Sequence, residues 1–478
     1  MPQRAGGMLR AFFPLAGVRT AIAATVAVAV AALWALRSRL LLPILVVLAV
    51  IAVGVGDNRR SAMPVNAAVP TDLPVPGYGP KNFSAAIADA DNRIALGREK
   101  MLRAPHEWTS QESLARGLMA RAALTGDYRE WAEARQLLDA GMASAPRGSG
   151  PVVAEATLAL STHRLGVAEQ DLEILTRAAV PPDLGQRSGM AGLAGDIALY
   201  RGDMRAAAGH YLRGAQLSAG PAINFRIGVL AMTQARFADA DAAIFRSVTG
   251  DRRHTPQMLA QAAMRLGAHA LAQGNWPKAD RWFARADQLF PGYWLIAAHR
   301  AQAAALRGDP TAADRMAAIA HRSNSAEAMD AAAMLYRQRG DGANSRQWAA
   351  RAGALWDERL RILPEAAMGH ALEHQLAFGT AERALDLARK NVAQRPYGEA
   401  RLLLASALIM NNRPRDALVE IELAEASGWR SAPLYAVKAE AAALAGQAQA
   451  ARAARESAEA INPRIFDPRT SLIWFSHG

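Results

Sequence analysis

The segment from 370 to 374 has the residue types and spacing of a metal site. It reads HALEH, so His370 and His374 are four residues apart and Glu373 precedes the second histidine. On a helix, two residues at this spacing share one face, and their imidazole nitrogens can bind Zn²⁺ together. The neighbouring carboxylate could act as the base toward a zinc-bound water. The chemistry indicated is metal-dependent hydrolysis.

A third protein ligand is difficult to find for this pair. The spacing His-x-x-Glu-His is that of the inverted zinc peptidases, and the nearest downstream acid at a suitable distance is Glu440. In the helical organisation described next, Glu440 lies two repeats away, on the order of 20 Å for helix spacings of ~10 Å. We therefore keep a metal-dependent hydrolase as the alternative hypothesis, and predict no catalytic residue, no metal and no cofactor.

The helices that carry these residues are predicted from a pattern of small and large side chains. Its clearest copy is RLGAHALAQGNWPKADRWFARADQLFP, residues 265–291. Gly267 lets two helices touch, Ala279 fills the narrow crossing, and Phe283 closes the core beneath them. The letters QGNW form the turn between the helices, and Pro291 ends the second helix.

This pattern resembles the tetratricopeptide repeat, which has two antiparallel helices per repeat. The same frame fits about ten times between residues 112 and 465, about three quarters of the chain. Equivalent places in two further copies are taken by Gly195, Ala207 and Tyr211, and by Gly228, Ala240 and Ile244. The tryptophan expected near the start of each repeat is missing throughout. The resemblance implies an all-α solenoid built from helical hairpins.

The resemblance also implies a concave groove lined by the first helix of each repeat. The family's groove positions fall on Phe225, Val229, Met232, Met264, Leu271, Leu295, Gln302, Met334, Leu376, Leu402, Ile409 and Met410. This apolar, methionine-rich set suits the helix or extended peptide of a partner protein. Alternatively, tight coiling buries these side chains against adjacent repeats. The basic and asparagine clamp that some family members use for a terminal carboxylate is absent from these positions.

Two uncharged segments near the N-terminus predict a membrane anchor. Residues 20–36 and 40–56 are separated by Arg37, Ser38 and Arg39, and each would span roughly 25 Å as a helix. If both segments cross the bilayer as a hairpin, the remaining chain is cytoplasmic. If only the second crosses, the remaining chain is periplasmic, and the distribution of arginines fits both topologies equally.

The segments together suggest a division of the chain into five parts. We expect a basic N-terminal segment, a transmembrane anchor, a proline-rich linker, a solenoid and a C-terminal tail, at 1–19, 20–56, 57–82, 83–465 and 466–478. Thr109 and Glu112 are spaced as a capping box for one of the first helices of the solenoid.

Charge and composition exclude some classes of function. The net charge is +12, and residues 1–60 carry half of it, so the remaining positive charge is too dilute for a nucleic-acid partner. There is no cysteine, which removes disulfides and thiolate chemistry. The main hypothesis is a scaffold in the cell inner membrane, held by lipid contacts of residues 20–56. It would bind other proteins in assembly, translocation or polysaccharide-export machinery.

Overall fold

The computed structural model describes residues 72–178, 180–249 and 254–475, and these residues form helices and connecting segments without a strand. The helices are α3 (Phe83–Arg103), α4 (Trp108–Thr125), α5 (Tyr128–Ser144), α6 (Val152–Ser161), α7 (Leu165–Thr176), α8 (Leu184–Tyr200), α9 (Met204–Leu217), α10 (Pro221–Thr233), α11 (Phe237–Val248), α12 (Pro256–Ala272), α13 (Trp276–Leu289), α14 (Trp294–Leu306), α15 (Ala312–Ser323), α16 (Ala326–Gln338), α17 (Gly342–Ile362), α18 (Pro364–Phe378), α19 (Ala381–Gln394), α20 (Gly398–Met410), α21 (Pro414–Ser427), α22 (Ala432–Leu444), α23 (Ala448–Ile461) and the 3₁₀ helix η1 (Pro468–Leu472).

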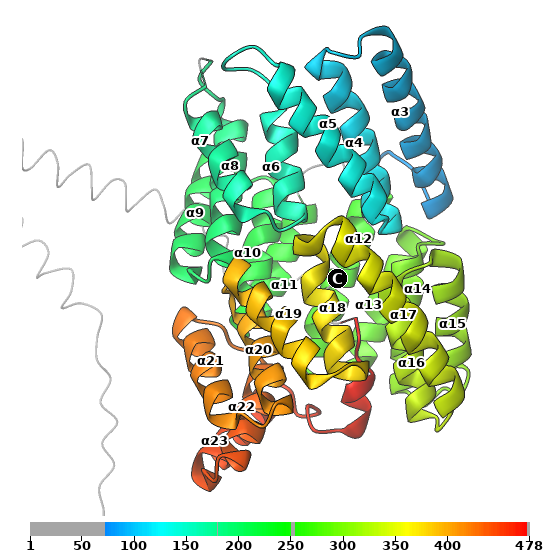
Figure 1. Cartoon of the computed structure of the whole chain (residues 1–478), viewed down its shortest axis with the longest axis vertical. Coiled ribbons are helices and arrows are strands. Elements are labelled where there is room, and N and C mark those ends of the chain that lie inside the picture. The colour runs from blue at the N-terminus through cyan, green and yellow to red at the C-terminus, as the bar shows by residue number, and fades with distance from the viewer. Residues whose placement is uncertain (1–71, 179, 250–253, 476–478) are drawn as a thin grey trace, which may run out of the picture. The chain divides into compact units, whose positions relative to one another are not determined.

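Successive helices pair into hairpins from α4 onward. Each even-numbered helix packs along the odd-numbered helix that follows it, and each hairpin then stacks on the next (Figure 1). Helix α3 packs against α4 as an additional helix before the first hairpin. The prediction of an all-α solenoid is therefore confirmed for the described residues.

The turns within the hairpins follow from local sequence. Between α12 and α13, Gly274 adopts a left-handed conformation with φ of 70°, which glycine reaches without strain. The side chain of Asn275 then accepts a hydrogen bond from Lys278 N at 3.1 Å and caps α13. The predicted capping box is wrong: Thr109 lies inside α4, whose N-cap is Glu107 without a side-chain bond.

Close helix crossings recur at one spacing. A glycine on the first helix faces a large residue sixteen positions later on the second helix of the same hairpin. A Cβ added at the glycine would lie 2.2 to 2.9 Å from that side chain in three pairs: Gly195 with Tyr211, Gly228 with Ile244, and Gly267 with Phe283. Since only glycine leaves room there, these crossings fix how the two helices of a hairpin meet.

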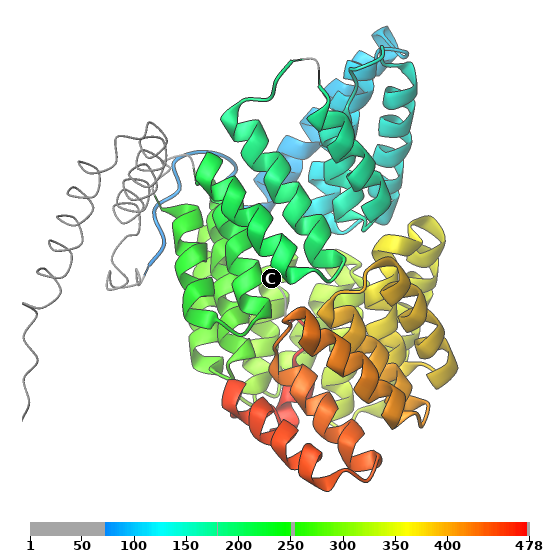
Figure 2. The same ribbon diagram turned by 90° about the vertical axis from the view of Figure 1, so that its left-hand side faces the viewer.

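The stacked hairpins wind into a coil whose successive turns touch. The Trp294 Nε1 on α14 donates to the carbonyl of Leu124 on α4 at 2.9 Å, and Arg430 N donates to the carbonyl of Thr233 at 2.9 Å. Both contacts join parts of the chain that are ten or more helices apart. In both views the later helices, yellow to orange, lie beneath the early cyan helices (Figures 1 and 2).

The last part of the predicted linker packs on the solenoid. Leu73 is buried in the apolar core formed around α12 and α13. Asp72 forms an ion pair with Arg285 at 2.9 Å, and Gly77 N donates to the carbonyl of His254 at 3.0 Å. Residues 72–82 are thus held along the helices that follow them.

The expected inner-membrane location needs correction. Among the helices of the described residues, none is both long and apolar enough to cross a membrane. The segments on which the expectation rested, 20–36 and 40–56, lie outside the described residues, as does the basic segment 1–19. The structure therefore gives the anchor, its lipid contacts and the inner-membrane assignment no support.

We expect that Gly267→Ala lowers the free energy of unfolding by about 1–3 kcal/mol, the usual effect of overpacking a core. The added methyl group would meet the ring of Phe283, which is fully buried. Urea unfolding followed by circular dichroism measures the change.

Gly166→Ala on α7 is the matched control, because a Cβ there meets nothing within 4 Å. It should leave stability unchanged or raise it by up to about 1 kcal/mol. Equal effects of the two substitutions would contradict the role given to the crossing.

Candidate functional site

The concave side of the coil holds a cavity of about 1000 Å³. Its walls come mainly from the first helices of four consecutive hairpins, α6, α8, α10 and α12, and from the segment between α7 and α8, with smaller contributions from α7, α9 and the end of α11. Apolar side chains make up most of the lining: Val153, Leu160, Leu175, Val180, Met190, Leu193, Leu199, Phe225, Val229, Val248 and Met258. A cavity of this size and composition is typical of a site for a peptide segment or a small apolar ligand.

The residues predicted for the groove lie in different surroundings. Phe225 and Val229 line the cavity. Met264 and Leu271 are buried in the core, each at 2% exposure, and so face neighbouring helices. Five others pack partly buried against the large core cluster: Leu295, Met334, Leu376, Leu402 and Ile409. Met232 is half-buried and Met410 is exposed. The alternative of burial against adjacent repeats therefore describes several of them better than an open groove.

Gln302, the remaining predicted groove residue, binds the chain's own C-terminal segment. Its Oε1 accepts hydrogen bonds from Trp474 N at 2.7 Å and Phe475 N at 2.8 Å, and its Nε2 donates to the Phe475 carbonyl at 3.0 Å. Leu472 and Phe475 are buried in the large core cluster that extends from α12 to α22, and η1 packs against α14 and α16. The red segment runs in among the helices of the coil (Figure 1). The concave side thus holds a peptide by its main chain and by apolar side chains.

Two arginines occupy equivalent places in the cavity. Arg226 on α10 and Arg265 on α12 each stand two residues before the crossing glycine of their hairpin. Arg226 Nε lies 2.8 Å from Asp196 Oδ2, and Tyr211 donates to Asp196 Oδ1 at 2.8 Å. Burial raises the pKa of Asp196, although Arg226 and Tyr211 favour its charged form.

Arg265 has different surroundings. Its guanidinium lies 5.3 Å from the ring centre of Phe225, and no described carboxylate forms an ion pair with it. Burial lowers its pKa to about 10, so the group stays charged at neutral pH. Tyr200 lies beside it in the cavity lining and packs edge-on against Tyr397 of the next turn of the coil, at 5.3 Å between ring centres.

The histidine motif does not assemble a metal site. His374 is buried and pairs through Nδ1 with Asp330 Oδ1 on α16 at 2.6 Å. His370 pairs with Glu373 at 2.9 Å and stacks on Trp356. Within the described residues, no group of three His, Asp or Glu side chains could hold a metal ion. His370 and His374 contact neighbouring helices, and Glu373 pairs with His370 within α18, which leaves the hydrolase alternative without geometric support.

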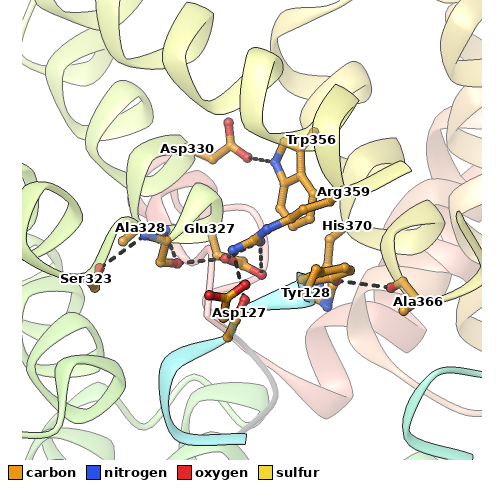
Figure 3. A network of polar contacts seen from close by, with 12 residues as sticks. Asp127, Tyr128, Ser323, Glu327, Ala328, Asp330, Trp356, Arg359, Ala366 and His370 are labelled. Carbon is orange, nitrogen blue, oxygen red and sulfur yellow. Dashed lines mark hydrogen bonds and ion pairs between the residues drawn. The ribbon is translucent and has the colours of Figure 1, made fainter. Parts of the chain in front are cut away.

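An arginine in a buried ion pair beside this motif joins two turns of the coil (Figure 3). Arg359 Nη1 on α17 lies 3.0 Å from both carboxylate oxygens of Glu327 on α16. The guanidinium also covers the ring of Tyr128 on α5 at 4.7 Å and donates to the Gly126 carbonyl at 3.4 Å. Burial alone would raise the pKa of Glu327, but Arg359 and His370 lower it to about 2.

Sequence reasoning missed the polar residues of the cavity. The chain is very rich in arginine, so the residue type of Arg226 and Arg265 did not mark them as part of a binding site. Asp196 likewise stood out by no feature of its own. The repeat frame could have found the two arginines, since both precede a crossing glycine by two residues. The ion pair with Asp196 comes from the neighbouring hairpin and depends on how hairpins stack.

The glycine crossings at sixteen-residue spacing, repeated in stacked hairpins, decide the type of solenoid. The stacked hairpins have the form of tetratricopeptide repeats. No family model and no curated protein matches the sequence. Solved structures similar to this solenoid include a tetratricopeptide repeat protein from Parabacteroides merdae, at 14% identity, a TM-score of 0.33, and coverage of 60% of this chain and 99% of that chain.

Two further solved structures with a similar fold are eukaryotic proteins. Yeast Tom70 is 13% identical, with a TM-score of 0.31 and coverage of 81% of this chain and 89% of its own. The human IFIT1 dimer with m7Gppp-AAAA is 11% identical, with a TM-score of 0.37 and coverage of 78% and 94%. At these identities the similarity concerns the fold alone.

We expect that Arg359→Met destabilises the protein by about 3 kcal/mol, the lower end of the effect of breaking a buried ion pair. The lower end applies because the Glu327 side chain keeps 21% exposure. The control is Arg383→Met, which breaks an exposed pair with Asp357 and should cost less than about 1 kcal/mol.

The same pair has a pH signature. Since the pKa of Glu327 falls to about 2 from an ordinary value of 4.5, its stabilising effect is complete above 4.5 and is lost as the pH falls toward 2. Unfolding of wild type and Glu327→Gln across this range should show a difference that shrinks with acid. A constant difference would contradict the assigned charge.

We expect that Gln302→Ala releases the C-terminal segment. The main-chain groups of Trp474 and Phe475 would lose their partners at a cost of about 1–3 kcal/mol. Amide hydrogen exchange of residues 472–475 should therefore accelerate about tenfold, while exchange in α14 stays unchanged. Ser471→Ala, on the exposed side of the same segment, is the control and should leave exchange unaltered.

Proposed function

We propose that the protein is a scaffold that binds a segment of a partner protein in the cavity lined by α6, α8, α10 and α12. The supporting observation is the C-terminal segment, because the same concave side of the coil already holds a peptide through Gln302 and through buried Leu472 and Phe475. The occupied part begins at α14, the first helix of the hairpin that follows α12 and α13.

The character of the lining also favours a protein partner. Its side chains are mainly aliphatic, with methionine at Met190 and Met258, and such surfaces adapt to the irregular shape of a partner's side chains. The cavity spans four hairpins, as an extended or helical segment requires. The envelope machines expected from the sequence have no part in this proposal, since that expectation depended on the membrane location corrected above.

Gly189 on α8 provides a way to block the cavity without disturbing the core. It lines the cavity, and a Cβ built on it meets nothing within 4 Å. The proposed test selects 12-residue peptides from a phage-displayed library on the immobilised full chain. Binding of the selected peptides should fall about tenfold or more on Gly189→Trp, since the indole would occupy the site.

Gly166→Trp is the matched control. Gly166 is likewise helical and exposed with open space around it, but it does not line the cavity. Peptides should bind this variant as they bind wild type. Selected peptides that bind Gly189→Trp undiminished, or a selection that enriches none, would overturn the proposal.

A further inference from the structure

Of the two arginines that line the cavity, Arg265 forms no ion pair with a described carboxylate. Arg265 lines it, and the Nε atom of Arg265 is enclosed with no hydrogen-bond partner among the described residues. A guanidinium carries five N–H donors and is charged at every physiological pH. Leaving such a group in apolar surroundings without an anion is unfavourable, so the site is suited to receiving one.

The acids nearest Arg265 accept hydrogen bonds from other groups. Asp196 accepts from Arg226 and Tyr211, as described above. Glu399, across the turn of the coil, accepts from the Tyr397 hydroxyl at 3.1 Å. Tyr200 is neutral, because burial raises its pKa. The equivalent Arg226 therefore pairs with a carboxylate from the neighbouring hairpin. Arg265 forms no ion pair within the described residues, although Glu399 is near enough to favour its charged form.

Apolar groups surround this charge. Phe225 covers one face of the guanidinium at 5.3 Å, while Met258 and Ala262 line the cavity on the same helix as Arg265. An anion that reaches Arg265 must therefore arrive between apolar groups. A carboxylate held bidentately is the protein group that best matches a guanidinium in geometry and charge.

We propose that Arg265 is the specificity-determining residue of the cavity and binds an internal Asp or Glu side chain of an apolar partner segment. This inference rests on the proposed function and adds the chemistry of the partner. Apolar side chains of the segment pack on α6, α8 and α10, and its carboxylate pairs with the guanidinium on α12. The ion pair selects among apolar segments that would otherwise bind alike.

The test uses the peptides selected on the full-length wild-type chain, synthesised with amidated C-termini. Those sensitive to Gly189→Trp should share an acidic residue with apolar neighbours on both sides. Replacing that residue by its amide, or Arg265 by Met, should each weaken binding about tenfold or more, and the two changes together should weaken it no further. Arg265→Lys should restore part of the affinity.

Arg205→Met serves as the matched control, since Arg205 is exposed on α9 and lies outside the cavity lining. It should bind all peptides as wild type does. The melting temperature separates a binding role from a structural one. Removing an unpaired, enclosed charge should leave the Tm of Arg265→Met unchanged or raised, whereas a structural role predicts a lowered Tm.

The outcomes distinguish the two proposals. Cavity-dependent peptides without a shared acid, or peptides that bind Arg265→Met as well as wild type, would overturn the role of Arg265 and leave the scaffold function standing. Binding only of peptides with a free terminal carboxylate would also overturn it, because the acidic side chain would then be dispensable. Absence of any peptide sensitive to Gly189→Trp would overturn the scaffold function itself.

Discussion

The close approach of two helices at a glycine is the constraint on which the rest of the structure depends. At Gly267 the backbone of α12 lies so near Phe283 of α13 that even a methyl group has no room. The same crossing at Gly195 and Gly228 gives these hairpins a similar internal geometry. Because similar units stack with a similar rotation, a coil follows from the repetition of one contact.

The coil in turn determines where binding surfaces exist. Its turns touch through Arg359, Trp294 and Arg430, so the inner side is narrow and many side chains expected there are buried. One stretch of this inner side is filled by the C-terminal segment on Gln302. The stretch along α6 to α12 stays hollow, and the polar groups Arg226, Asp196 and Arg265 lie within it. The cavity along α6 to α12 therefore results from the same coiling of the hairpins that forms the solenoid.

The sequence predicted the local part of this structure well and the long-range part poorly. The hairpin pattern around Gly267, Ala279 and Phe283 depends on contacts within about thirty residues, and a repeating spacing reveals such contacts. Whether a groove residue is open, as Val229 is, or bound to the chain end, as Gln302 is, depends on segments far along the chain. The ion pair of His374 with Asp330 likewise joins separate repeats, so the HALEH motif looked like a metal site only in isolation.

The contacts between successive turns of the coil affect how cooperatively this repeat array unfolds. In an open repeat array each unit interacts with its nearest neighbours only, and terminal units can fray while the centre persists. Here Gly126 and Tyr128, near the start of the solenoid, are held by Arg359 from well beyond its middle. Unfolding of the hairpin of α4 and α5 therefore exposes part of the distant hairpin of α16 and α17. Because the two hairpins depend on each other, the array should unfold more cooperatively than an open repeat array.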